Sequence, residues 1–82
     1  MEQNMEQYFY LESPTRGYVN ISFIRELNMN VQFGSRDPTF FKSKEKCEIF
    51  AKMLCYVVAD TEVKSTDGFE DWYVRLLERY SL

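Results

Sequence analysis

The sequence predicts an α+β fold, in which a three-stranded antiparallel meander is followed by two α-helices in two packed layers. Alternating apolar and polar residues in the first half are typical of strands with one wet face. Apolar residues at helical spacing in the second half indicate two amphipathic helices. A chain of 82 residues, 45% apolar and 17% aromatic, suits one domain over 1–82, with residues 1–5 expected to fray.

The strands are expected in the first forty residues. Aromatic residues favour a strand at Gln7–Glu12, and Ser13–Gly17 contains the Pro and Gly of a turn. Two alternating strands follow, and their inward-facing residues are expected to be Val19, Ile21, Phe23, Met29, Val31 and Phe33. After a break at 34–38, Thr39–Phe41 is extended, either as a short fourth strand or as the approach to a helix.

The first helix is expected to begin at Ser43, a good N-cap residue, and to run to about Asp60. Its core-facing stripe is predicted to consist of Cys47, Phe50, Ala51 and Leu54. The run Met53–Ala59 contains no charged residue, and successive helical residues point about 100° apart, so this run would be apolar on all sides. We therefore expect Met53–Ala59 to form the central pillar of the core, between the sheet and the second helix.

The second helix has a capping-box signal, with Asp67 at the cap and Glu70 three residues later. The residues 61–66 before it are expected to form a polar connection. One broad apolar face is predicted, made of Phe69, Trp72, Tyr73, Leu76, Leu77 and Tyr80.

Residue types needed for catalysis are scarce. There is no histidine, which removes the usual general base and the commonest transition-metal ligand. Cys47 and Cys55 lie about 12 Å apart along the predicted helix, too far for a disulfide, and two lone thiols do not make a zinc site. We expect no enzymatic activity, no metal and no cofactor. The free thiols and the absence of an apolar stretch near 18 residues favour a cytoplasmic protein, in the host cytoplasm if phage encoded.

The leading hypothesis is a non-enzymatic protein-binding inhibitor or modulator. Its basis is the small size, the surplus of aromatic residues and the neutral polar residues on the outer sheet face. The candidate partner-binding residues are Tyr8, Tyr10, Asn20, Ser22, Asn30 and Gln32.

Two further surfaces are considered. A homodimer could form through Tyr56, Trp72, Tyr73 and Tyr80, although an intramolecular core is the alternative explanation for these residues. A small nucleic-acid-binding accessory protein is the alternative function, with contacts from Arg36, Lys42, Lys44 and Lys46. The net charge of −3 and the glutamates among these lysines make nucleic acid the less favoured partner.

The segment Phe40–Cys47, placed between strands and an apolar helix, resembles the arm domains of phage integrases. Those domains are basic where they read DNA, whereas this chain is acidic. In size and topology the chain is also similar to some phage-encoded inhibitors of bacterial defence, including anti-CRISPR proteins. By analogy, this resemblance implies a phage or mobile-element protein that acts on a host or defence-system protein, in the manner of an anti-CRISPR or anti-restriction protein.

Overall fold

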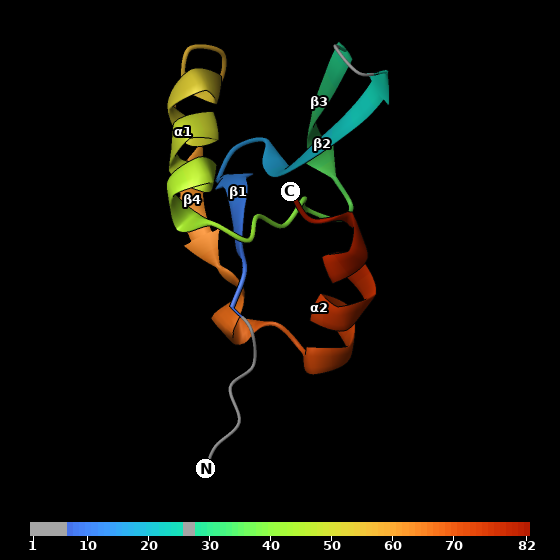
Figure 1. The fold of residues 1–82 in the computed structure, drawn as a ribbon. Coiled ribbons are helices and arrows are strands. Elements are labelled where there is room, and N and C mark those ends of the chain that lie inside the picture. Colours follow the sequence, from blue (N-terminus) through green and yellow to red (C-terminus); the bar gives the residue numbers. More distant parts are fainter. Residues whose placement is uncertain (1–6, 26–27) are drawn as a thin grey trace.

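The computed structural model describes residues 7–25 and 28–82 (Figure 1). Residues 1–5, predicted to fray, lie outside the described part. The elements in chain order are the strands β1 (Phe9–Ser13), β2 (Gly17–Arg25) and β3 (Asn28–Ser35), helix α1 (Lys44–Leu54), strand β4 (Glu62–Ser65), the 3-10 turn η1 (Thr66–Gly68), helix α2 (Asp71–Leu77) and the 3-10 turn η2 (Glu78–Tyr80). The predicted α+β class, with a meander before two helices, is confirmed.

The strands form one antiparallel sheet in the order β3-β2-β1-β4. The fourth strand is not Thr39–Phe41, as the sequence suggested. Phe41 makes only a single bridge to Phe9, with N–O distances of 3.0 and 2.6 Å. β4 arises instead from the predicted polar connection, because it pairs along β1 from Phe9↔Ser65 to Glu12↔Glu62.

The β1–β2 turn is confirmed at Ser13–Gly17, and Gly17 adopts a positive φ of 94°. Gly34 also has a positive φ, of 84°. A Cβ atom on Gly17 would lie 3.1 Å from the Cα of Gly34, so only glycine fits here without displacing the backbone. These two glycines let β2 and β3 approach closely at the base of their hairpin.

The inward alternation of β2 and β3 holds near the base of this hairpin only. Val19 and Ile21 are buried, and Val31 and Phe33 pack partly buried against the same cluster. Phe23 and Met29, which pair with each other towards the tip, are exposed. Their predicted core position is wrong because the outer part of the hairpin points away from both helices (Figure 1).

Helix α1 begins as predicted, since the Ser43 hydroxyl accepts a hydrogen bond of 3.2 Å from the Lys46 amide. Its buried stripe is also confirmed at Cys47, Ala51 and Leu54. The helix ends at Leu54, however, well short of Asp60, and tight turns follow.

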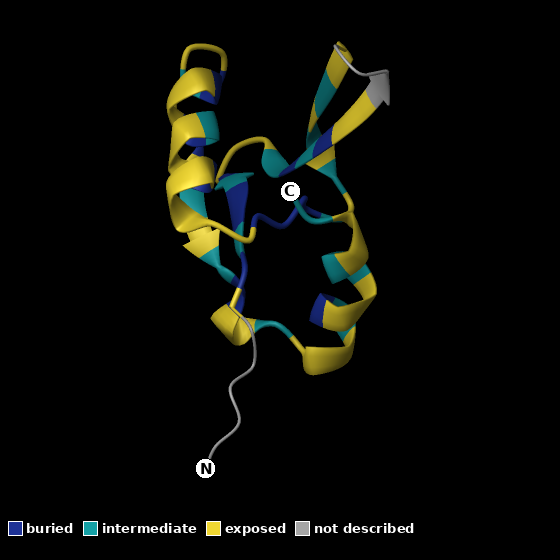
Figure 2. Cartoon of the chain, viewed as in Figure 1, coloured by how far each residue is buried: buried dark blue, intermediate teal, exposed yellow. Residues whose placement is uncertain are grey.

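The apolar run Met53–Ala59 is therefore not the pillar of the core. Only Leu54 and Val58 are buried, whereas Met53, Val57 and above all Tyr56, at 94% exposure, face solvent. The run lies at the far end of α1, away from α2, so no second helix covers it (Figures 1 and 2).

Helix α2 begins later than predicted. Asp67 lies in η1, and the N-cap of α2 is Glu70, which makes no side-chain capping bond. The reason lies in η1, where the Phe69 amide bonds the Thr66 carbonyl and ends this turn before α2 begins.

Alternate residues of β1 enter two different clusters. Leu11 packs with Val19, Phe41 and the buried stripe of α1, and we call this set the α1-side cluster. Tyr8 and Tyr10 pack with Phe40 and Val74, and we call that set the α2-side cluster. The helices thus lie on opposite sides of β1 (Figure 1), each over its own cluster, whereas the sequence led us to expect that both would complete one core.

Candidate protein-binding surface

Three large exposed side chains lie along α2 and the 3-10 turn η2 that follows it. Trp72, Leu76 and Tyr80 follow one another at intervals of four residues and are 63%, 51% and 67% exposed. Trp72 and Leu76, four residues apart, lie on one face of α2, and Tyr80 follows in η2. We call these three residues the α2 stripe. The sequence placed them on the same face as Tyr73 and Leu77, but those two point inward towards the α2-side cluster.

The α2-side cluster packs against the inward side of α2 and so holds the stripe in place. Tyr10 and Phe40 both contact the ring of Phe69, with centroid distances of 5.1 and 5.9 Å. The Tyr8 ring stacks on Phe40 at 5.9 Å, and its hydroxyl donates to a Glu78 carboxylate oxygen at 3.1 Å. Tyr8 and Tyr10 are buried, so their predicted role as partner contacts is wrong. They position α2 instead.

Tyr73 ties α2 to the segment after β3. Its hydroxyl donates to Asp37 Oδ1 at 2.5 Å. Burial, together with this bond and the Asp37 charge, raises the pKa of Tyr73 above its ordinary value. The hydroxyl therefore stays protonated at neutral pH and remains a donor.

A hollow of about 300 Å³ lies at each end of the stripe. The hollow at the Trp72 end is lined by Tyr18, Gly68, Phe69, Glu70, Trp72 and Tyr73. The hollow at the Tyr80 end is lined by Asn20, Ile21, Ser22, Asp37, Pro38, Thr39, Phe40, Leu77 and Tyr80. Two predicted polar contacts, Asn20 and Ser22, thus adjoin Tyr80 of the predicted dimer face.

The other two predicted polar contacts lie beside these. Asn20 pairs in register with Gln32, and Ser22 with Asn30, so the four form one polar patch on the hairpin. Asn20 also donates to the Asp37 carbonyl at 3.2 Å. The structure therefore brings the polar patch and the Tyr80 end of the stripe together.

The four residues of the predicted dimer face do not share a surface. Tyr56 lies in the turn after α1, whereas Trp72, Tyr73 and Tyr80 belong to α2 and η2 on the other side of β1 (Figure 1). A second exposed apolar set lies on α1 itself and the turn beyond it, at Ile49, Met53, Tyr56 and Val57. Ile49 also lines an open groove of about 600 Å³, together with Ala51 and Val63.

The four basic residues are exposed and lie at two ends of one connection. Arg36 follows β3, with only a 3.9 Å contact to Asp37. Lys42, Lys44 and Lys46 surround the start of α1, where Glu45 lies among them.

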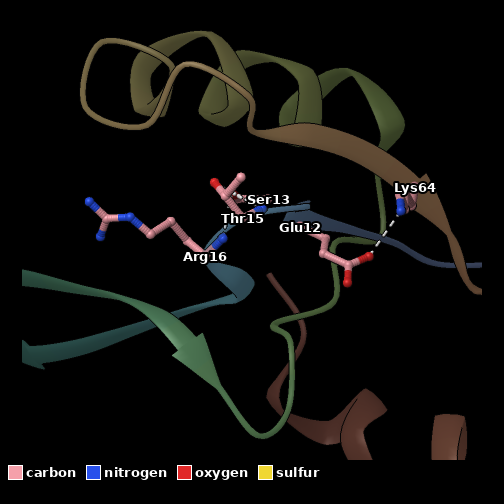
Figure 3. A network of polar contacts seen from close by, with 5 residues as sticks. All are labelled: Glu12, Ser13, Thr15, Arg16 and Lys64. Atoms are coloured by element: carbon pink, nitrogen blue, oxygen red, sulfur yellow. Dashed lines mark hydrogen bonds and ion pairs between the residues drawn. The ribbon is translucent and has the colours of Figure 1, made fainter.

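The Ser13 hydroxyl lies at the centre of a polar network in the β1–β2 turn. It donates to Asp60 Oδ1 at 2.6 Å and accepts from the amides of Thr15 and Arg16, at 3.3 and 3.0 Å. Figure 3 shows this turn beside the 3.0 Å ion pair between Lys64 and Glu12. Hydrogen bonds from Ser13 and Thr15 lower the pKa of Asp60. Asp60 is thus a poor general base, and this Ser–Asp pair stabilises the turn rather than forming a nucleophile.

The two free thiols differ in their burial. Cys47 is fully buried, and burial with the nearby Glu48 charge raises its pKa to about 12, so the thiol is neutral at pH 7. Cys55 is partly buried, and its sulfur lies 3.5 Å from the Thr61 carbonyl. Within residues 7–25 and 28–82, no three His, Cys, Asp or Glu residues gather in a way that could hold a metal ion.

No family model matches the chain, and neither curated proteins nor solved structures gave a match. The helices in the described part are all too short or too polar to cross a membrane. The candidate site therefore depends on the geometry of this chain alone.

Proposed function

We propose that this chain is a non-enzymatic protein-binding module, and that the α2 stripe with the adjoining polar patch forms its partner-binding surface. The observation that carries the proposal is the exposure of Trp72 and Leu76 on α2 and of Tyr80 in η2. Tryptophan and tyrosine dominate the binding energy of protein interfaces because they bury much area and order few rotors.

The support beneath the stripe strengthens this proposal. A binding surface loses less free energy on association when its side chains are already held in place. The Trp72 ring rests edge-on against Tyr73 at 5.7 Å, and Tyr73 is bonded to Asp37. The polar patch adds neutral hydrogen-bonding groups at the rim, as interfaces commonly have around an apolar centre.

The specific form that we propose is an inhibitor or modulator, encoded by a phage or mobile element and acting on a host or defence-system protein. Its support is the small size and the lack of histidine. The alternative, a nucleic-acid-binding accessory protein, has less support. Its basic residues lie at the two ends of the segment that joins β3 to α1, and the acidic Glu45 lies between two of the lysines.

The test is quantitative capture from a bacterial lysate with the W72A/Y80A variant and a matched control, I49A. Ile49 is also an exposed apolar helix residue, but it lies on α1. We expect wild type and I49A to capture the same protein in stoichiometric amounts. W72A/Y80A should lose about 2 kcal/mol or more of binding free energy, roughly a thirtyfold fall in affinity for that protein.

Two results would overturn the proposal. The first is equal capture by W72A/Y80A and wild type, which would place binding elsewhere. The second is the absence of any stoichiometric partner. Circular dichroism of all three proteins checks that the substitutions leave the fold intact, as expected for exposed positions.

A further inference from the structure

The β2–β3 hairpin extends beyond the rest of the sheet. β1 pairs with β2 only at Glu12↔Tyr18 and Ser13↔Gly17, whereas β2 and β3 pair from Tyr18↔Ser35 to Arg25↔Asn28. Thr39 then bonds the same edge of β2 at Val19 and Ile21. Beyond Ile21 the hairpin is therefore a two-stranded arm (Figure 1). Two strands alone are only marginally stable in water, and a further strand would stabilise them.

The two edge strands of the sheet, β4 and β3, differ in how well they are protected against pairing with a further strand. β4 is four residues long and carries Glu62 and Lys64, and Lys64 pairs across the strands with Glu12. Short length and charge are common devices that discourage further strand pairing. β3 is eight residues long, Asn-Met-Asn-Val-Gln-Phe-Gly-Ser, and has neither a charge nor a proline. β3 ends the sheet within the described residues, so its outer edge is open to another strand.

The composition of β3 suits pairing with itself. In an antiparallel pair related by a two-fold axis, each residue faces a residue of the same strand in the other copy, so any charge would risk meeting a like charge. With the axis at Val31, Met29 faces Phe33 of the second copy, and Asn30 faces Gln32. Apolar side chains then meet on one face of the sheet and amides meet on the other.

The exposed apolar residues of the arm lie on the face that such pairing would extend. Val31 and Phe33 are only partly covered by the α1-side cluster. Phe23 and Met29, further along the arm, are 53% and 40% exposed. A strand placed beside β3 would cover part of Met29 with the Phe33 ring.

We propose that β3 pairs antiparallel with β3 of a second copy, about a two-fold axis at Val31, so that the two sheets join into one. This interface is separate from the α2 stripe. It includes Asn30 and Gln32 of the polar patch, so the dimer leaves the α2 stripe, but not the whole patch, free in each copy.

Sedimentation equilibrium of wild type and two charge variants tests this register. In N30K/Q32K, each new lysine would face a lysine of the second copy, in two equivalent pairs. In N30K/Q32E, the same positions would bring opposite charges together. Both positions face the neutral Asn20 and Ser22 within the chain, so both variants should fold, as circular dichroism would check.

We expect a wild-type mass of twice 9.9 kDa, a dimer dissociation constant raised about tenfold or more in N30K/Q32K, and a dimer retained in N30K/Q32E. A strictly monomeric wild type would overturn the proposal. So would equal weakening of both variants, or a dimer that neither variant changes. W72A/Y80A should remain dimeric, so failure of this inference is distinguishable from failure of the proposed function.

Discussion

The two sides of β1 are held together by different means. On the α1 side, an eleven-residue helix with a side-chain cap packs the small residues Cys47 and Ala51 against the strand. On the α2 side, a seven-residue helix without a side-chain cap is held by aromatic rings and by hydroxyl-to-carboxylate bonds. A short helix has little stability of its own, so α2 depends on its contacts. Because those contacts involve the inward side of α2, Trp72 and Tyr80 remain exposed to solvent.

Substitutions at two adjacent residues test whether the two sides of β1 are stabilised separately. Phe40 and Phe41 are both fully buried, but Phe40 belongs to the α2-side cluster and Phe41 to the α1-side cluster. Each change to alanine should lower the free energy of unfolding by about 3–5 kcal/mol. Hydrogen exchange should show that F40A loosens the amides of α2 first and that F41A loosens those of α1 first.

Since a small domain has little stability to spare, F40A and F41A could unfold altogether. The milder pair F40L and F41L, each expected to cost about 1 kcal/mol, then serves for the same exchange measurement. Equal loosening of both helices by either change would mean that the two sides form a single cooperative unit, contrary to the comparison.

The second prediction concerns the hydroxyl of Tyr73. Y73F removes its bond to Asp37 and should lower the free energy of unfolding by about 1.5 kcal/mol, the lower end for a bond to a charged group, because water can reach the Asp37 carboxylate. Urea denaturation at pH 7 measures this difference. No loss of stability would mean that the aromatic rings alone hold α2.

This contribution should also depend on pH. The pKa of Tyr73 is raised in the folded protein above the ordinary value of 10.0, so folding favours the neutral hydroxyl. The stability that the hydroxyl adds is fully present below pH 10 and is lost as the pH rises from there towards the raised pKa. The difference between wild type and Y73F should therefore shrink in alkali.

The smallest expected changes in the free energy of unfolding concern the N-caps of the two helices. S43A removes the cap of α1 and should cost about 1 kcal/mol. E70A, at the start of α2, should change the free energy of unfolding by less than about 0.5 kcal/mol, because Glu70 makes no capping bond. Thermal unfolding of both variants measures the contrast, and an equal cost would show that Glu70 stabilises α2 in some other way.

Local patterns predicted most of the α1 side and little of β4. The hydroxyl of Ser43 and the spacing of Cys47 and Ala51 act within one helix, so their roles can be seen in the sequence. β4 has a single apolar residue, Val63, and forms because a distant strand pairs with it. Such long-range pairing leaves almost no local signal.

The candidate partner-binding residues could be placed only in part, again because local patterns do not show long-range packing. Asn20 and Ser22 alternate with buried residues, so their exposure follows from strand periodicity. Tyr8 and Tyr10 were misplaced because β1 is covered on both faces. The unbroken apolar run from Tyr8 to Leu11 was the available signal, since strands buried on both sides lose their alternation.

The close approach of Gly17 and Gly34 sets the direction of the whole hairpin. The hairpin beyond this contact is about seven residues long, or roughly 23 Å. A Cβ atom on either glycine would come within 3.1 Å of the opposite backbone, so a side chain at this contact would displace one strand relative to the other. Because Phe23 and Met29 pair near the tip, a small change in strand direction at this contact would move them by several ångströms. The position of the exposed Phe23 and Met29 therefore depends on two residues that have no side chain, Gly17 and Gly34.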